Sequence, residues 1–316
     1  MRVLVTGADG FVGRRLVPRL LAAGHHVLAA CRPGGPPLAE WLGAGVSGVA
    51  TVPLELADDA SVQAVAAHAV DAVVHLAALS SGAEARRHPA AAWEANAVGT
   101  ARLLYALGER RLAGDADPVV LVISTAEVYG AGPARPRRED DPVAPVSPYA
   151  ASKVGAETAA LETWRRTGLR AIVVRPFQHT GPGQSPTFVV PAWAARLRDA
   201  ARRGERTIAT GNLTPVRDLL DVRDVVDAYV ALLERGVPGE IYNVASGIGV
   251  PLSELFERLA RLAGVAAVAV PDPALVRSAD IPHLVGDPGK LRAATGWKPC
   301  FTLDDTLRGV VDAQAD

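Results

Sequence analysis

The sequence predicts an α/β fold built on a doubly wound parallel sheet, with a smaller C-terminal α/β domain. Apolar runs typical of buried parallel strands alternate with helical patterns at a spacing of about thirty residues, and the first run leads straight into a glycine-rich turn. The chain has 316 residues, of which 49% are hydrophobic, so it can bury a large core and form two domains. We expect residues 1–175 to form the first domain, with returns to it near 215–245, and residues 176–316 to form most of the second.

The N-terminal unit has the pattern of a dinucleotide-binding turn. A short apolar strand over 2–6 is followed by the spacing Gly-x-x-Gly-x-x-Gly and by a helix predicted over 11–23. The first glycine permits a tight turn, the second lets the backbone approach a pyrophosphate, and the third lets the helix pack on the strand. The helix N-terminus then presents unpaired N–H groups to the phosphates. The turn predicts a Rossmann-type cofactor site at Gly7, Gly10, Phe11, Val12 and Gly13.

The end of the second predicted strand indicates which dinucleotide binds. The strand over 26–30 runs into Cys31 and Arg32, at a point where NAD-binding units commonly carry an acid for the ribose 2′-hydroxyl. An arginine instead suits a 2′-phosphate by charge and by forked hydrogen bonds, and Arg14 and Arg15 lie near enough in sequence to assist. Arg32 therefore favours NADP(H), with NAD(H) possible, unless it is an ordinary solvated loop cation.

The next strands are predicted over 52–56, 72–76 and 119–123, and Asp58 is predicted to cap the helix after the first of them. The run 72–76 is nearly continuous apolar sequence, and the small residues after it let the chain pass close to a cofactor. His75, inside this strand, is expected to be a packed, hydrogen-bonded core residue rather than a catalytic one. These segments supply five further expected cofactor contacts and one substrate contact: Glu55, Leu56, Leu76, Ala77 and Ala78, and Ser80.

Helices are predicted over 89–112 and 148–166, and a further strand over 170–174. The segment 130–146 is rich in Pro, Arg and acidic residues, which indicates a loop before the second helix rather than an interdomain linker. Open α/β sheets bind ligands at the carboxyl ends of their strands. The residues just after 123 are therefore expected to lie at the site.

Tyr149 and Lys153 are the residues that carry chemistry, together with Thr125. Residues four apart share a helix face, so the Lys153 ammonium can lie beside the Tyr149 phenol and lower its pKa from the usual value of about 10. Such a phenol exchanges a proton with a carbinol or carbonyl near neutral pH, and Thr125 offers its hydroxyl to the same oxygen. Tyr-x-x-x-Lys alone is a weak signal, and its weight comes from the glycine turn upstream. Together they predict hydride transfer.

Composition excludes several classes of partner. A formal net charge of −1 without a basic tract gives no reason to propose nucleic acid or an anionic membrane. There is no apolar run of about 18 residues for a membrane span and no charged-then-apolar secretory leader. Cys31 and Cys300 make neither a disulfide framework nor a metal site. We therefore expect a cytoplasmic protein without a metal.

On these motifs the chain resembles the extended short-chain dehydrogenase/reductases of the NAD(P)-dependent nucleotide-sugar epimerase/dehydratase superfamily, over residues 1 to about 307. The resemblance implies that Tyr149 is the acid/base, that Lys153 also holds the nicotinamide ribose, and that Thr125 orients the substrate oxygen. The family motifs match Gly7 to Gly13, Asn96 to Thr100, Thr125 with Tyr149 and Lys153, and Arg175 to Phe177. Further implied cofactor contacts are Asn96, Ser124 and Pro176.

The second half most resembles reductases of GDP-linked 4-keto-6-deoxy sugars, and next the GDP-mannose 4,6-dehydratases. The likeness lies in residues 175–184, 188–191, 211–224 and 286–297. It implies that two arginines clamp a diphosphate, that two valines line a guanine pocket, and that a glutamine contacts sugar or pyrophosphate. Forked cations suit a diphosphate, although each arginine taken singly can be a surface ion pair. The residues are Arg217 and Arg277, Val189 and Val190, and Gln178.

The neighbours of Thr125 bear on the reaction type. In the 4,6-dehydratases of this superfamily the next residue is usually an acid or a hydroxyl, followed by Glu. Here Ala126 cannot protonate a departing hydroxyl, although Glu127 can remove a proton and is a further catalytic candidate. The alternative role of Glu127 is a structural one, satisfying backbone donors behind Tyr129.

The sequence therefore favours NADPH-dependent reduction of the C4 ketone of a nucleotide-linked 4-keto-6-deoxy sugar, with GDP as the favoured nucleotide. A nucleotide-sugar 4-epimerase and a GDP-mannose 4,6-dehydratase are the alternatives. A non-enzymatic NADP-sensing protein is least favoured, because the catalytic triad is complete. Relatives pair helices equivalent to 89–112 and 148–166 in a four-helix interface, so a homodimer is expected.

Overall fold

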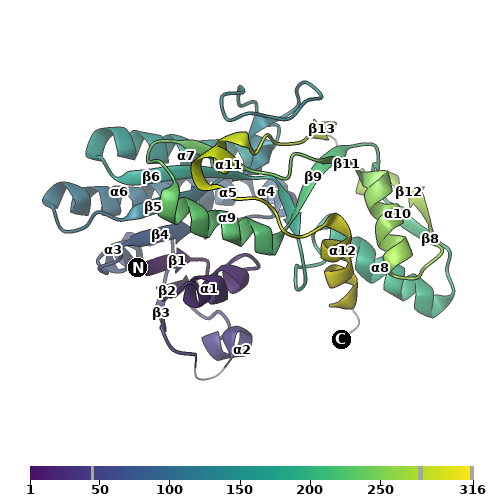
Figure 1. Ribbon diagram of the computed structural model, residues 1–316, viewed down its shortest axis with the longest axis horizontal. Coiled ribbons are helices and arrows are strands. Elements are labelled where there is room, and N and C mark those ends of the chain that lie inside the picture. Colours follow the sequence, from purple (N-terminus) through teal and green to yellow (C-terminus); the bar gives the residue numbers. More distant parts are fainter. Residues whose placement is uncertain (44–45, 277–279, 314–316) are drawn as a thin grey trace.

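The computed structural model describes residues 1–43, 46–276 and 280–313. Its centre is a seven-stranded parallel sheet with the strand order β10-β6-β5-β4-β1-β2-β3 (Figure 1). The order reverses at β1, because the chain adds strands first on one side of β1 and then on the other. The doubly wound α/β fold predicted from the sequence is confirmed. The strands are β1 (Arg2–Thr6), β2 (His26–Cys31), β3 (Val49–Pro53), β4 (Ala72–His75), β5 (Val119–Ile123), β6 (Arg170–Pro176) and β10 (Ile241–Val244).

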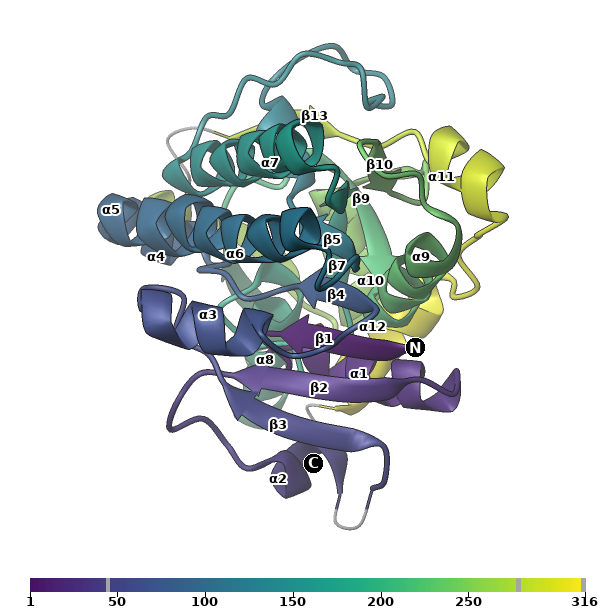
Figure 2. The same cartoon turned by 90° about the vertical axis from the view of Figure 1, so that its left-hand side faces the viewer.

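Helices cover both faces of this sheet (Figure 2). Leu4 of β1 packs into a core shared with α3, α6 and α7, whereas Val3 and Val5 pack into a second core shared with α1 and α9. Because both faces are buried, the central strands are apolar at nearly every position. The helices are α1 (Gly13–Ala22), α2 (Leu38–Leu42), α3 (Asp59–Ala66), α4 (Gly82–Arg87), α5 (Pro89–Trp93), α6 (Gly99–Ala113), α7 (Pro148–Thr167), α8 (Val189–Arg203), α9 (Val222–Arg235), α10 (Leu252–Leu262), α11 (Gly289–Thr295) and α12 (Leu303–Asp312).

A smaller unit beside this sheet is built mainly from the later part of the chain. Strand β9 pairs with β7, β11 and β13, and β8 pairs with β12. Helices α8, α10 and α12 share a third apolar core next to these strands. The chain also returns to the large sheet through α9 and through β10, which pairs with β6. The remaining strands are β7 (Gln178–Thr180), β8 (Thr207–Thr210), β9 (Val216–Asp221), β11 (Gly249–Pro251), β12 (Val268–Pro271) and β13 (His283–Leu284).

Two predicted elements differ from the structure. The third strand covers 49–53 instead of 52–56, because β3 is an edge strand that buries few side chains and so carries little apolar signal. The helix predicted over 89–112 is divided into α5 and α6 by a wide π turn at Glu94–Val98. A π turn of this kind re-aims side chains without ending the helical path, and the apolar pattern does not report it.

Two local expectations are met. The Asp58 carboxylate caps α3 by accepting a hydrogen bond from the backbone N–H of Ala60 at 3.0 Å. His75 is buried, with Nδ1 2.8 Å from the Thr6 hydroxyl and Nε2 3.0 Å from the Thr100 hydroxyl. Burial lowers the pKa of His75 to about 3, so it is a neutral core residue. In the described ranges, none of the helices has the length and apolarity that a membrane crossing requires.

Candidate active site

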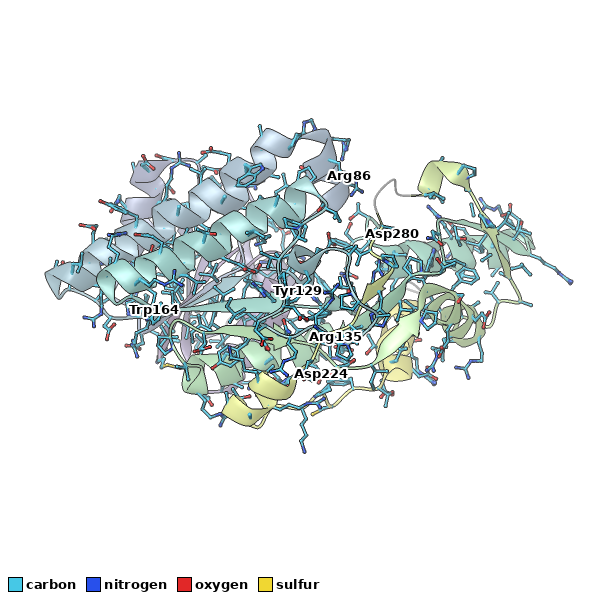
Figure 3. The ribbon with its side chains drawn as sticks, turned by 90° about the horizontal axis from the view of Figure 1, so that it is seen from above. Arg86, Tyr129, Arg135, Trp164, Asp224 and Asp280 are labelled. Carbon is cyan, nitrogen blue, oxygen red and sulfur yellow. The ribbon has the colours of Figure 1, made fainter. Side chains whose placement is uncertain are left out.

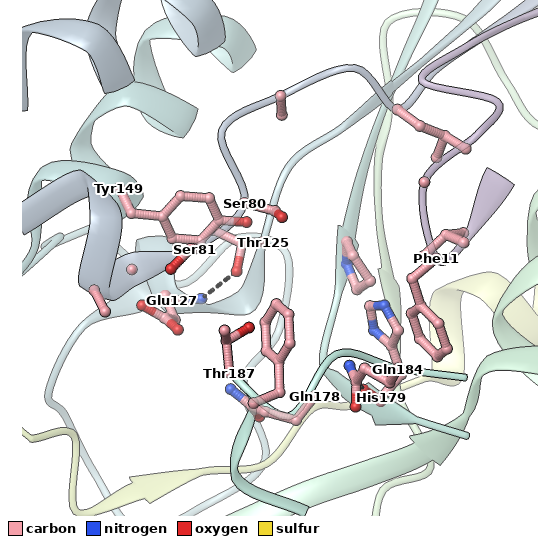
Figure 4. A pocket seen from close by; sticks show the side chains of 18 of the residues that line it. Phe11, Ser80, Ser81, Thr125, Glu127, Tyr149, Gln178, His179, Gln184 and Thr187 are labelled. Atoms are coloured by element: carbon pink, nitrogen blue, oxygen red, sulfur yellow. Dashed lines mark hydrogen bonds between the residues drawn. The ribbon is translucent and has the colours of Figure 1, made fainter. Parts of the chain in front are cut away.

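A cavity of about 1150 Å³ runs from the glycine turn across the carboxyl ends of the strands to α8 and β9 (Figure 4). It is lined by nearly all of the residues that the sequence singled out. These are Gly7, Gly10, Phe11, Val12, Gly13, Arg32, Glu55, Leu56, Leu76, Ala77, Ala78, Ser80, Ser124, Thr125, Glu127, Tyr149, Lys153, Pro176, Gln178, Val189, Val190 and Arg217. Asn96 is not among the lining residues, and Arg277 lies outside the described residues.

The glycine turn requires glycine at Gly7 and Gly13, because a Cβ at either position would clash with the backbone. Gly7 has φ +65°, and a Cβ there would lie 2.9 Å from the backbone nitrogen of Ala77. At Gly13 a Cβ would lie 2.5 Å from the carbonyl oxygens of both Gly7 and Ala8. No side chain caps the start of α1, and its first turn contains no acid. Its N-terminal N–H groups are therefore suited to an anion such as a pyrophosphate.

Three arginines near the glycine turn differ in how they are engaged. Arg32 is exposed at the cavity wall. Arg14 donates from Nε to the carbonyl of Asp9 at 2.7 Å, and Arg15 donates from Nη2 to the carbonyl of Pro182 at 2.7 Å, so both guanidinium groups already have backbone partners. Arg32 is thus the guanidinium with the greatest freedom to meet a 2′-phosphate.

Asn96, expected at the cofactor, is completely buried behind the loop that follows β4. Its Oδ1 accepts from the backbone N–H of Leu79 at 2.7 Å, and its Nδ2 donates to the Leu79 carbonyl at 3.1 Å and to Ser152 Oγ at 2.9 Å. The Ser152 hydroxyl in turn donates to the Tyr149 carbonyl at 2.8 Å. Asn96 therefore positions the loop and α7 relative to each other, and the structure does not place its amide in the cavity.

Tyr149 and Lys153 lie in the first turns of α7, whose start the sequence determines locally. Ser147 accepts from the N–H of Ala150 at 3.1 Å, and Pro148 occupies the first helical position. Thr125 follows β5, and its hydroxyl accepts from the N–H of Glu127 at 3.2 Å (Figure 4).

The pKa of Tyr149 is raised, contrary to the expectation that Lys153 would lower it. Burial is the main cause, the negative charge of Glu127 adds to it, and the hydrogen bond with Thr125 opposes both. The Lys153 ammonium donates a hydrogen bond to the Ile123 carbonyl at 2.6 Å, rather than to the Tyr149 phenol. Burial lowers the pKa of Lys153 to about 8, against the opposing effect of Glu157.

Sequence reasoning missed a buried ion pair behind this triad. Arg175 donates from Nε and Nη2 to the two oxygens of Glu157 at 2.9 and 2.7 Å, and these side chains are only 4% and 6% exposed. The Ser124 hydroxyl also donates to Glu157. The Arg175 guanidinium lies 4.8 Å from the ring centre of Tyr129, whose side chain is 1% exposed. Tyr129 lies in the middle of the molecule (Figure 3). The available signal was the Lys153–Glu157 spacing, which places both on one face of α7.

Two of the residues expected to contact the substrate, Gln178 and Arg217, differ in their hydrogen bonding within the protein. Gln178 Oε1 is buried without a hydrogen-bond partner in the part of the chain that the structure describes. Arg217 lines the cavity, yet it donates to the Ile281 carbonyl at 2.6 Å and to Asp280 at 2.7 Å. A diphosphate would compete with Asp280 for this guanidinium. The sequence analysis did not predict the Arg217–Asp280 pair.

One further pair of rings borders the cavity. Phe11 and His179 are stacked with their centres 6.5 Å apart and their planes 6° apart. Burial lowers the pKa of His179, whose Nδ1 lies 2.9 Å from the Phe177 carbonyl, so the ring is neutral near pH 7. Phe11 was predicted at the cofactor. No sequence pattern predicted that His179 would lie beside Phe11.

Comparisons with known proteins agree with this geometry. Residues 3–245 match the model of the NAD dependent epimerase/dehydratase family. The chain is 37% identical to a GDP-6-deoxy-D-mannose reductase of Pseudomonas aeruginosa, over 98% of this chain and 96% of the relative. A solved structure of RMD from Pseudomonas aeruginosa complexed with NADPH is similar with a TM-score of 0.82 and 34% identity, over 99% of this chain and 98% of the other. A Thermus thermophilus UDP-glucose 4-epimerase in complex with NAD is similar with a TM-score of 0.85 and 30% identity, over 100% and 99% of the two chains. With a glycine turn, a Thr-Tyr-Lys triad and a shared cavity in place, the chain belongs to the NAD dependent epimerase/dehydratase family.

Proposed function

We propose that this protein reduces the C4 ketone of a GDP-linked 4-keto-6-deoxy sugar with NADPH. The observation that carries the proposal is that Thr125, Tyr149 and Lys153 line one cavity, with Lys153 held by the Ile123 carbonyl and no acid at position 126. Ala126 is completely buried in an apolar cluster. The likeness to the GDP-6-deoxy-D-mannose reductase supports GDP as the nucleotide.

The side chains at the triad suit proton donation to a ketone. Burial raises the pKa of Tyr149, so its phenol is protonated near pH 7, which is the form that a reduction requires. When bound, NADPH supplies the hydride that the ketone carbon accepts. Tyr149 then gives its proton to the ketone oxygen, while Thr125 orients that oxygen by a hydrogen bond. The Lys153 ammonium, held by the Ile123 carbonyl, adds a positive charge to the cavity in which the alkoxide would develop.

The reaction itself is tested by mixing the enzyme with NADPH and a GDP-linked 4-keto-6-deoxy sugar and following NADPH absorbance. We expect oxidation of one NADPH per sugar reduced, and slower oxidation with the UDP-linked analogue. A 4-epimerase would convert a GDP- or UDP-hexose into its epimer without added cofactor, and a dehydratase would form a 4-keto-6-deoxy product from GDP-mannose. Either product without NADPH consumption would contradict the reductase assignment.

Cofactor choice should depend on Arg32. We expect Arg32→Asp to weaken NADPH binding by about ten- to a hundredfold, because one charge-assisted contact with the 2′-phosphate is replaced by repulsion. NADH affinity should be unchanged or higher, because a carboxylate can accept from the 2′-hydroxyl. Fluorescence titration of both cofactors measures this. Equal affinity of the wild type for the two cofactors would exclude the preference.

Cofactor affinity should also depend on pH through Lys153. Its pKa is lowered to about 8, so its ammonium is charged below that pH and neutral above it. If the ammonium binds the nicotinamide ribose, as the family resemblance implies, NADPH affinity is full below pH 8 and falls as pH rises through this value. Titrations between about pH 6.5 and 9.5 measure the inflection. Lys153→Met should remove it, and an inflection that survives this substitution would assign it to another group.

We also propose a homodimer formed through α6 and α7, in a reducing cytoplasm. Large apolar side chains are exposed along α5 and α6 and the turn between them, including Trp93, Tyr105 and Leu112, which are 45%, 55% and 58% exposed. Such a stripe favours burial by a second copy. Both cysteines are free thiols, which suits a reducing compartment. Light scattering that gives a monomer mass would refute the dimer.

A further inference from the structure

Tyr229 of α9 is a buried polar residue that the mechanism above does not use. Its side chain is 0% exposed and it is one of the residues that line the cavity. Its hydroxyl has no hydrogen-bond partner among the residues that the structure describes. Buried hydroxyls are nearly always paired, because leaving one unpaired is costly. A group of this kind at a ligand cavity indicates a partner that the ligand supplies.

Two other buried tyrosines show that the fold normally satisfies this group. The Tyr129 hydroxyl donates to Asn243 Oδ1 at 2.7 Å, and the Tyr242 hydroxyl accepts from the backbone N–H of Val237 at 3.2 Å. These side chains are 1% and 2% exposed, so their burial matches that of Tyr229. Neither of them lines the cavity. Among these three buried tyrosines, the one with the unpaired hydroxyl is the one that lines the cavity.

The position of α9 places this hydroxyl on the cofactor side of the cavity. Helix α9 packs against α1, β5 and β7, and it covers the same face of the sheet as α1 (Figure 2). Tyr229 belongs to the apolar cluster that contains Ile123, whose carbonyl holds Lys153. The pKa of Tyr229 is raised by burial and by the charge that Tyr149 would carry, so the two phenols are within electrostatic range. Tyr229 thus lies near the catalytic end of the dinucleotide-binding half.

We propose that Tyr229 is a cofactor-binding residue whose hydroxyl forms a hydrogen bond with the nicotinamide half of NADPH. The glycine turn is placed to hold the pyrophosphate and Arg32 marks the adenosine end, so the nicotinamide half extends toward Tyr149. That half carries a carboxamide with donors and an acceptor, and a ribose with hydroxyls, which complement a phenol that both donates and accepts. The inference rests on the proposed function only in taking NADPH as the cofactor.

Tyr229→Phe tests this by removing one oxygen and keeping the ring. We expect the Kd for NADPH to rise about three- to tenfold, the effect of one lost hydrogen bond. The Kd for adenosine 2′,5′-bisphosphate, which lacks the nicotinamide half, should not change. The cofactor-free protein should have an equal Tm, or one higher by about 1–3 °C, because an unpaired buried hydroxyl has been removed.

Tyr242→Phe is the matched control, since it removes an equally buried hydroxyl that has a partner. It should lower the Tm and leave the Kd for NADPH unchanged. An unchanged Kd for NADPH in Tyr229→Phe would overturn the proposal, and so would equal weakening of NADPH and the adenosine fragment. A fall in Tm as large as that of Tyr242→Phe would do the same, by showing that the protein itself pairs the hydroxyl. If NADPH binds but no sugar ketone oxidises it, the reaction proposal fails while the assignment of Tyr229 stands.

Discussion

Replacing Tyr149 with phenylalanine should lower kcat for ketone reduction by about a hundred- to ten-thousandfold, which is the usual contribution of one positioned acid. The phenol is the proton donor in the proposed step, and Thr125 is too weak an acid to replace it. NADPH binding should change by less than about twofold, because the ring remains and Lys153 keeps its bond to the Ile123 carbonyl. Steady-state kinetics and cofactor titration on one preparation measure both quantities.

Tyr105→Phe is the control for this substitution. Tyr105 lies on α6, its side chain is 55% exposed, and it is not among the residues that line the cavity. The substitution keeps the aromatic ring, and with it the apolar surface proposed for the dimer, so kcat and the Kd for NADPH should stay at wild-type values. If Tyr149→Phe kept more than about a tenth of the wild-type kcat, the proton would have to come from another group, and Glu127 would be the first to examine.

Glu157→Gln should lower the free energy of unfolding by about 3–5 kcal/mol, because it leaves the buried Arg175 charge without a counter-ion. The glutamine amide can still accept one of the two hydrogen bonds that Arg175 now donates, so the lower end of this range is expected. Denaturant unfolding followed by circular dichroism measures the change. The pKa of Lys153 should fall further below about 8, since Glu157 is the charge that raises it.

Glu162→Gln provides a matched comparison on the same helix. Glu162 pairs with Arg166 at 2.6 Å, but these side chains are 54% and 38% exposed. Water and salt screen such a pair, so its loss should cost no more than about 0.5 kcal/mol. An unfolding midpoint for Glu157→Gln equal to that of Glu162→Gln would show that the Glu157–Arg175 pair does not stabilise the fold. Replacing both Glu157 and Arg175 with apolar residues should recover much of the loss, because no buried charge is then unpaired.

Features that depend on neighbouring residues were readable in the sequence. The glycine turn is one, because the conformation of Gly7 and the packing at Gly13 follow from the absent Cβ. The start of α3 is another, because Asp58 caps it through an N–H group two residues away. The parallel sheet follows from continuous apolar strands, and the helical spacing of Tyr149 and Lys153 places them on one face. These signals were enough for the fold class, for the glycine turn and for the placement of Tyr149 and Lys153 on one helix face.

Features that depend on distant residues appeared only in the tertiary structure. Glu157 and Arg175 meet because α7 packs on β6, and no residue close to Arg175 in the sequence indicates that contact. Asn96 reaches across 56 residues to Ser152, and Arg217 reaches across 63 residues to Asp280. The Lys153 ammonium likewise binds the carbonyl of Ile123, which is 30 residues away, rather than the phenol of Tyr149. The sequence by itself determined which chemical groups are present and which share a helix face or a strand end. The tertiary structure alone decided how they are paired, because a buried charge or hydroxyl takes the nearest partner in space, and chain separation does not limit that choice.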